Sequence, residues 1–456
     1  MYEFSGKLKS LALALMLIGA VGIGIGFFNG SSKTAEDAKE AIAHHDAEKA
    51  TKEEAAKTAI QYGKHNSNGV KKKLKHDAHG EENAHHDAHA AEHKIEHALT
   101  QIHNRPWAAV FVAMFFFFMI ALVIFVFYTM QIGASAGWSI VLFRVMEAMS
   151  VAIMPIGVLL LIFLGLSAMG MNHIFPWMHA EGDAVLEGKA MWLNIPGWMI
   201  RSVVYVIGYI LFRKLIIKKN HEQDTASDYS SHEKAFKYTI FFLAFFLITE
   251  TTLAWDWVMS LDPHWFSTLF GWYIFASAIV TSIAVIAMVT IYLKSKGYLE
   301  FVNDSHIHDL GKYMFGFSIF WAYLWFAQYM LIWYSNMPEE TTYFMQRMQQ
   351  YQFIFFAMVA MNLAFPFLIL MDTTYKRKAA FVLTAGAFIL VGHYIDFFVM
   401  IMPSTVGAYW HFGIPEIGAI LFFLGLFIFC GFKNLEKRSL ASKNNPYWTE
   451  SEHYHY

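Results

Sequence analysis

Cysteine is almost missing from this chain, because Cys430 is the only one among 456 residues. A single thiol excludes an internal disulfide framework, and it cannot hold an iron–sulfur cluster, which needs about four thiolates. The motif C-x-x-C-H is missing too, so we expect no c-type haem on this chain. These two kinds of redox centre are therefore not expected on this chain.

Charge is also scarce. Charged residues make up 15% of the chain, against about 25% in soluble domains. The net charge of −2 gives no support to a nucleic-acid partner. Hydrophobic residues reach 56% and aromatic residues 17%, a composition typical of a protein that crosses a lipid bilayer repeatedly.

Apolar segments long enough to cross a bilayer as helices recur along the chain, since about 18 to 20 apolar residues suffice. The candidates are Leu8–Phe28, Trp107–Tyr128, Trp138–Leu166, Trp198–Ile217, Tyr238–Met259, Ser267–Leu293, Met314–Trp333, Phe353–Met371, Ala379–Met402 and Ile417–Phe432. The sequence thus predicts an all-α integral membrane protein with about ten transmembrane helices. In the first segment, Gly22 and Gly26 have the spacing of close helix–helix packing.

Basic residues collect in alternate loops, as in Arg213–Lys219 and Lys376–Lys378, and in the tail after Phe432. Because cytoplasmic loops carry the excess of Lys and Arg, we expect both termini in the cytoplasm.

The polar segment 31–105 holds half of the 22 histidines, and this orientation places it outside the cytoplasm. One interpretation is metal capture, with His85, His89 and His93 as weak candidate ligands at helical spacing. The other is a charged arm, partly helical or disordered, that lies against a partner protein.

Ionisable side chains inside the predicted spans are the main functional candidates, because a charge in hydrocarbon is costly unless it is paired or faces water. Arg144 and Glu147 lie one helical turn apart. Glu250 falls near the middle of its span, and Asp256 lies nearer the outer end. These four residues are candidates for a proton path, although buried ion pairs that only hold helices together would look the same.

His393 and Asp396 form a second pair, three residues apart. A carboxylate beside an imidazole suits a proton relay or a hydrogen bond to a quinone carbonyl. We therefore add both to the proton-path candidates. The same two residues, together with Arg201, are the candidates for quinone binding.

Residues Trp255–Tyr273 read WDWVMSLDPHWFSTLFGWY. This stretch resembles the ActF-type membrane subunit of bacterial alternative complex III, a quinol:cytochrome c oxidoreductase whose membrane subunits are NrfD/PsrC-like. Weaker similarities cover most of the chain from the second span onward, at Trp138–Glu147, Lys189–Arg201, Phe320–Gln328, Trp333–Glu340 and Gly392–Asp396.

The resemblance implies two four-helix bundles flanked by the first and last spans. We therefore expect a first helix in 1–30, the His-rich insertion in 31–105, bundles in 106–259 and 260–402, and a last helix with a cytoplasmic tail in 403–456. It also implies the inner membrane of a bacterium as the location.

The expected partners follow from the same resemblance. They are multihaem cytochrome c subunits, an iron–sulfur subunit, a paralogous ActC-type subunit, small membrane subunits, a terminal oxidase and lipids. Haem c and the iron–sulfur clusters would belong to these partners, and this chain would hold at most a quinone or menaquinone. The rival interpretations are a secondary transporter and a metal-ion exporter that uses the His-rich arm.

Overall fold

The structure is a computed structural model that describes residues 2–63, 83–180, 182–442 and 444–455, without the side chains of 52–63 and 83–90. It is 82% helical, with no strand in the described residues, which confirms the all-α prediction. In those residues nine helices are long and apolar enough to cross a membrane. Helices suit this task because each satisfies its own backbone hydrogen bonds within lipid. The protein is therefore a multi-pass membrane protein.

The first half of the chain contains α1 (Gly6–Ser31), α2 (Ala35–Gly63), α3 (Asn83–Gly133), η2 (Gly137–Leu142), α4 (Phe143–Met149), η3 (Ser150–Ala152), α5 (Ile153–Ala168), η4 (Pro176–Met178), α6 (Ala184–Lys189), α7 (Ile195–Gln223), α8 (Ser230–Trp257) and η5 (Met259–Leu261). The second half contains α9 (Phe270–Ser295), α10 (Asp304–Ser335), α11 (Pro338–Gln350), α12 (Gln352–Val359), the π-helical turn η6 (Ala360–Ala364), α13 (Phe365–Leu370), α14 (Thr373–Arg377), α15 (Ala379–Val406), η7 (Gly407–Tyr409), α16 (Ile414–Leu435) and α17 (Trp448–Glu452).

The predicted span Trp198–Ile217 lies within α7. This helix is not among the nine, although it packs along α5 and α8 as part of the helix bundle.

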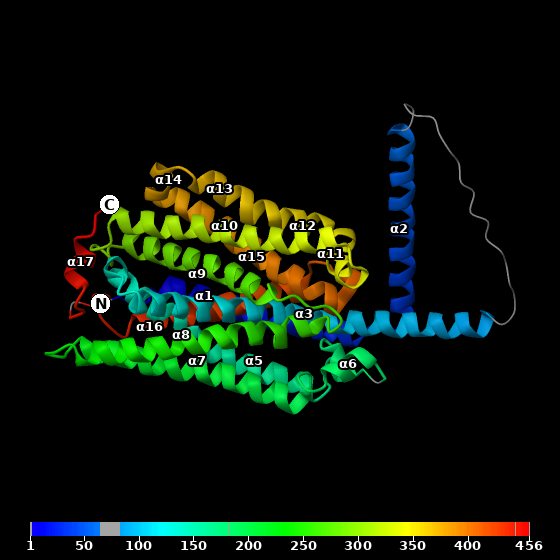
Figure 1. Ribbon diagram of the computed structural model, residues 1–456, viewed down its shortest axis with the longest axis horizontal. Helices are drawn as coiled ribbons and strands as arrows, with labels where there is room; N and C mark the ends of the chain where they lie inside the picture. Colours follow the sequence, from blue (N-terminus) through cyan, green and yellow to red (C-terminus); the bar gives the residue numbers. More distant parts are fainter. Residues whose placement is uncertain (1, 64–82, 181, 443, 456) are drawn as a thin grey trace.

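Two four-helix bundles lie side by side. In the first bundle α3, α5, α7 and α8 contact one another in a ring. In the second, α9, α10, the α12–α13 segment and α15 do the same. Figure 1 shows both chain ends at one end of these bundles, here named the termini end, and α2 beyond the opposite end, here named the arm end.

The helix α3 forms the common core of the molecule. It contacts α5 and α8 in the first bundle, α9 and α15 in the second, and α16 on a further side. Its residues from Phe111 to Tyr128 are buried almost without exception. They are nearly all large and apolar, as expected for a helix that is surrounded by other helices rather than by lipid on one face.

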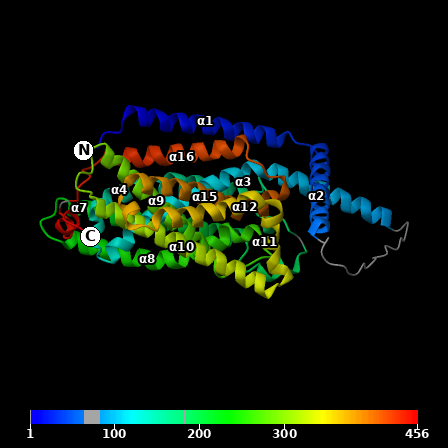
Figure 2. The ribbon, with the colours of Figure 1, turned by 90° about the horizontal axis from the view of Figure 1, so that it is seen from above.

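The first and last spans form a flanking pair, with α1 against α16 at the edge of the molecule in Figure 2. Gly22 lies against Gly418, and Gly26 lies against Pro415. A side chain at either glycine would meet these neighbours, so the predicted close helix packing is confirmed.

The polar insertion contributes α2 and the first part of α3, which continues the core helix out of the bundle. Lys94 on α3 donates a hydrogen bond to Asp46 on α2 at 3.0 Å, and the ring of His45 lies 6.4 Å from that of Tyr409. In both ribbon views α2 runs across the bundle axis at the arm end (Figures 1 and 2). Its described part is thus a folded arm.

The tail after α16 folds back over the termini end. The Ser451 hydroxyl donates to the Trp138 carbonyl at 2.8 Å and accepts from the Val141 amide at 3.2 Å. The Tyr454 hydroxyl donates to Asp309 on α10 at 2.8 Å. Because these contacts join η2 of the first half to α10 of the second, the tail links the two bundles.

Candidate functional site

A row of polar side chains follows one face of α7. Arg201, Tyr205, Tyr209 and Arg213 are spaced by four residues, so they lie one above another along the helix. They cover about 18 Å along the helix axis at 1.5 Å per residue. We name this row the polar stripe. It faces α8 over most of its length, and the first bundle's buried acids lie beside it.

At the arm end the stripe meets Asp256, which is fully buried. Arg201 binds this carboxylate at two points, with Nε 2.8 Å from Oδ2 and a terminal nitrogen 2.8 Å from Oδ1. The Tyr205 hydroxyl donates to Oδ2 at 2.9 Å, and the Trp192 indole donates to Oδ1 at 2.9 Å. Asp256 thus accepts four hydrogen bonds, two of them from the Arg201 guanidinium, as expected for a polar group that is fully removed from water.

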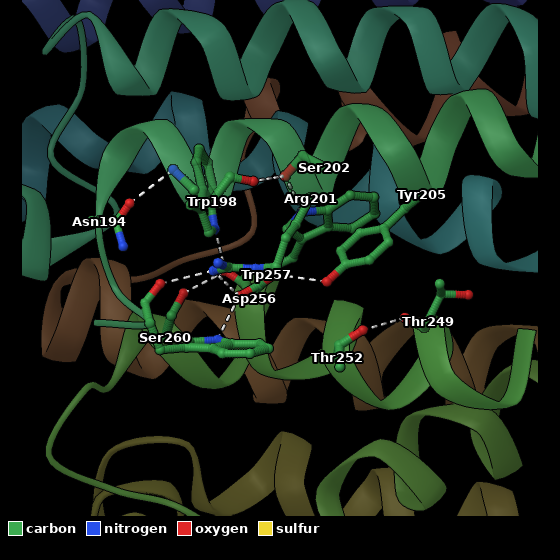
Figure 3. A network of polar contacts seen from close by, with 12 residues as sticks. Asn194, Trp198, Arg201, Ser202, Tyr205, Thr249, Thr252, Asp256, Trp257 and Ser260 are labelled. Carbon is green, nitrogen blue, oxygen red and sulfur yellow. Dashed lines mark hydrogen bonds and ion pairs between the residues drawn. The ribbon is translucent and has the colours of Figure 1, made fainter. Parts of the chain in front are cut away.

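The backbone around Asp256 is fixed as well (Figure 3). The Trp198 indole donates to the Asp256 carbonyl at 2.8 Å, and the Trp257 indole donates to the Ser202 hydroxyl at 2.9 Å. The start of α7 is set by Asn194, whose side chain accepts from the Gly197 amide at 2.8 Å. These bonds hold α7 and α8 in register.

Glu250 lies on the same helix as Asp256, six residues or about 9 Å nearer the middle of the bundle. Its side chain is buried, and its Oε1 has no hydrogen-bond partner. The Thr251 hydroxyl donates a long hydrogen bond to Oε2, at 3.5 Å. The adjacent Thr249 hydroxyl accepts from Tyr209 of the stripe at 2.8 Å. Unlike Asp256, Glu250 forms no ion pair with any described residue.

At the termini end the stripe reaches a second ion cluster. Arg144 donates to Glu147 at 2.7 Å and to Asp224 at 2.5 Å. Glu147 also accepts from the Tyr128 hydroxyl at 2.7 Å, and the His221 ring nitrogen lies 2.9 Å from it. Arg213, the last residue of the stripe, donates to the Glu147 backbone carbonyl at 2.7 Å. The stripe therefore runs from one buried ion cluster to the other.

The second bundle has its own buried acid, Asp396 on α15. It accepts from the Ser277 hydroxyl at 2.9 Å, from the Trp321 indole at 2.8 Å and from the Tyr273 hydroxyl. His393 Nδ1 lies 2.8 Å from the Ser277 oxygen. The Asn362 side-chain nitrogen lies 3.4 Å from the same Nδ1. The other ring nitrogen, Nε2, is buried and has no partner among the described residues.

Arg347 is a further buried cation, only 1% exposed, and it belongs to α11, outside the predicted spans. It donates to the carbonyls of Val399 at 3.0 Å and Met400 at 3.1 Å, and its guanidinium carbon lies 3.3 Å from the centre of the Tyr343 ring. With Asp396 and Gln328 it lines a small cavity in the second bundle.

The structure brings together most of the residues singled out from the sequence. Arg144 contacts Glu147, and His393 lies beside Asp396, as their spacing predicts. From the sequence, Arg201 is grouped with His393 and Asp396 for quinone binding. In the structure Arg201 lies in the first bundle and forms an ion pair with Asp256. Its position thus separates it from the other two candidates.

The metal interpretation of the insertion gains no support in the described part of the chain. There, no group of three or more His, Cys, Asp or Glu side chains is arranged to hold a metal ion. His93 is exposed, while the side chains of His85 and His89 lie outside the described residues.

Sequence reasoning missed Tyr205, Tyr209 and Arg213 of the stripe, His221 and Arg347. The four-residue spacing from Arg201 to Arg213 was a usable signal for the stripe. Nothing local in the sequence marks Arg347, because α11 is polar and folds back into the bundle only in three dimensions.

These features define the chain as a helical membrane protein with buried ion clusters at both ends of one bundle. In comparisons with known proteins, no family model matches the chain and no curated protein matches it.

Proposed function

We propose that this chain is an integral membrane subunit of a quinol-oxidising respiratory complex of the alternative complex III type, and that it conducts protons through its first bundle. The observation that carries the proton part is the position of Glu250. It is a buried carboxyl group without a cation, beside the polar stripe and between the Asp256 and Glu147 clusters. An ionisable group of this kind within a membrane span is typical of proton relays.

The stripe supplies hydroxyl groups on both sides of Glu250. The Tyr205 hydroxyl bonds Asp256, and the Tyr209 hydroxyl bonds Thr249, the neighbour of Glu250. Hydroxyl groups both donate and accept hydrogen bonds, so each can receive a proton and pass another on. In this proposal protons enter near Glu147, pass Glu250 and leave near Asp256, or travel in the opposite direction.

The complex part of the proposal rests on the resemblance of Trp255–Tyr273 and its companion segments to ActF-type subunits. A chain with one cysteine agrees with electron carriers located in iron–sulfur and multihaem cytochrome c partners. The Lys and Arg pattern supports a bacterial inner membrane protein with both termini in the cytoplasm. In this scheme His393 and Asp396 are the residues of the second bundle available to a quinone or to a second proton step.

The first test is purification of the tagged chain in mild detergent. We expect it to bring down c-type haem, read by absorbance, and an iron–sulfur protein, read by mass spectrometry, and the preparation should oxidise quinol. A colourless protein without partners would overturn the complex proposal and would favour the secondary transporter.

The second test is Glu250→Gln in the complex reconstituted into vesicles. Quinol oxidation and assembly should persist, whereas proton translocation should fall at least tenfold, because the amide cannot release a proton. Glu233→Gln is the matched control, since Glu233 lies on the same helix but is exposed. Unchanged translocation in Glu250→Gln would overturn the proton path and leave the complex proposal standing.

A further inference from the structure

A cavity of about 50 Å³ opens at the termini end of the first bundle. Arg144, Glu147 and His221 line one side, and residues 434–435 and 437–440, where the tail leaves α16, line the other. A volume of this size holds a few water molecules, at about 10–15 Å³ each, or one group as large as a phosphate. The cavity lies at the end of spanning helices, where the edge of the membrane is expected.

The carboxylates of this region are already paired. Glu147 accepts from Tyr128 and Arg144, with His221 beside it. Asp224, outside the cavity, is bound through both oxygens by Arg144. Arg213 lies on the far side of Glu147 and bonds its backbone carbonyl. The two carboxylates of this cluster are thus balanced by two guanidinium groups.

The charges on the tail side are not balanced. Within the described residues, Lys437 and Arg438 have no ion-pair partner and are exposed at the cavity rim. Arg144, which lines the same cavity, is 5% exposed, and its Nε has no hydrogen-bond partner among the described residues. The cavity therefore presents hydrogen-bond donors with a surplus of positive charge.

We propose that this cavity binds a phosphate group, through Lys437 and Arg438 at the rim and Arg144 at the base. Guanidinium and ammonium groups form their strongest hydrogen bonds with such oxyanions. Basic pockets between helices at the cytoplasmic side of a membrane suit anionic lipid head groups. The phosphate comes either from a phospholipid of the adjoining leaflet or from solution, and the chemistry of the site is the same in both cases.

Binding would tie the tail to the first bundle. The phosphate would bridge residues 437–438, just after α16, to Arg144 on α4, next to the Glu147 cluster. The site adjoins the proposed proton entrance at Glu147, but Lys437 and Arg438 are not part of that path, so their substitution tests the phosphate site separately.

The test measures binding of two probes to the protein in its purified complex, or alone if it has none. Native mass spectrometry measures phosphatidylglycerol, with diacylglycerol as a control that has the same chains but no phosphate. Calorimetry measures inorganic phosphate. We expect one equivalent of at least one phosphate-bearing probe per chain. Binding of the lipid alone would identify a head-group site, and binding of inorganic phosphate would identify a site for the free anion.

Lys437→Gln with Arg438→Gln should weaken that binding at least tenfold. Substitution of Arg144 is a poorer test, because it would also release Glu147 and Asp224. The control is Lys214→Gln with Lys378→Gln, which removes two exposed basic residues at the same end but outside the cavity. Equal binding by the two double variants, equal retention of diacylglycerol, or no binding of either phosphate probe would overturn the proposal.

Discussion

Arg347 bonds the backbone that Pro403 leaves without a helical partner. A proline has no N–H to donate to the carbonyl four residues earlier, and its ring disturbs the turn before it. In α15 that carbonyl belongs to Val399, and Arg347 donates to it and to the next one, at Met400. Arg347 on α11 thereby supplies the hydrogen-bond donor that α15 itself lacks at the Val399 carbonyl.

This relationship predicts a coupled pair of substitutions. Arg347→Leu should lower the unfolding temperature of the detergent-solubilised protein, because each buried carbonyl left without a partner costs about 1–3 kcal/mol. In a Pro403→Ala background the loss should be clearly smaller, since the alanine that replaces the proline would supply an N–H to the Val399 carbonyl. Strictly additive effects of the two substitutions would contradict this account. Lys378→Leu, at an exposed position outside the proposed phosphate site, serves as the control.

The pair Arg201 and Asp256 gives a second prediction. Arg201→Gln should destabilise the protein by roughly 3 kcal/mol, because the Asp256 carboxylate then remains buried and unpaired. Asp256→Asn should cost less, because the Arg201 side chain that it leaves is 21% exposed. The double variant should lose less than the sum of the two. Thermal unfolding followed by tryptophan fluorescence measures all three. Independent effects would show that the two side chains do not depend on each other.

Tyr209 tests the polar stripe directly. Tyr209→Phe removes only the hydroxyl that bonds Thr249, so assembly and quinol oxidation should remain. Proton translocation by the reconstituted complex should fall severalfold, because the stripe then lacks one of its hydroxyl groups. Tyr229→Phe, at an exposed position in the α7–α8 connection, should have no effect. If both variants translocate protons normally, the path does not use Tyr209.

The junction between α1 and the arm should depend on pH. The Asp37 carboxylate accepts hydrogen bonds from the Lys33 ammonium, at 2.8 Å, and from the N–H and hydroxyl of Thr34. These bonds hold the pKa of Asp37 below its usual range. A depressed pKa in the folded state means that ionised Asp37 stabilises the junction above about pH 4, its unfolded value. This contribution is lost as the pH falls from there through the folded pKa.

Hydrogen exchange measures this loss. The protection factor of the Thr34 amide should fall as the pH is lowered from about 4 through the lowered pKa of Asp37. In Asp37→Asn the protection should no longer change with pH. Protection that is constant over this range in the natural protein would contradict the prediction.

The sequence was sufficient for the parts of the fold that depend on local pattern. Apolar runs located the spans, and one-turn spacing paired Arg144 with Glu147 and His393 with Asp396. It was not sufficient for Arg201 and Asp256, which lie 55 residues apart and meet only because α7 and α8 pack side by side. It also gave no sign that the tail returns to η2 and α10, since the bonds of Ser451 and Tyr454 join segments more than a hundred residues apart.

The helix α3 runs unbroken from the arm into the centre of both bundles. Pro106 lies where this helix enters the bundle, and a proline removes one backbone hydrogen bond from the turn before it. The arm is therefore joined to the core by one continuous helix whose most easily bent turn lies at the bundle entrance. A displacement of the arm would reach the buried segment that begins at Phe111 through this turn.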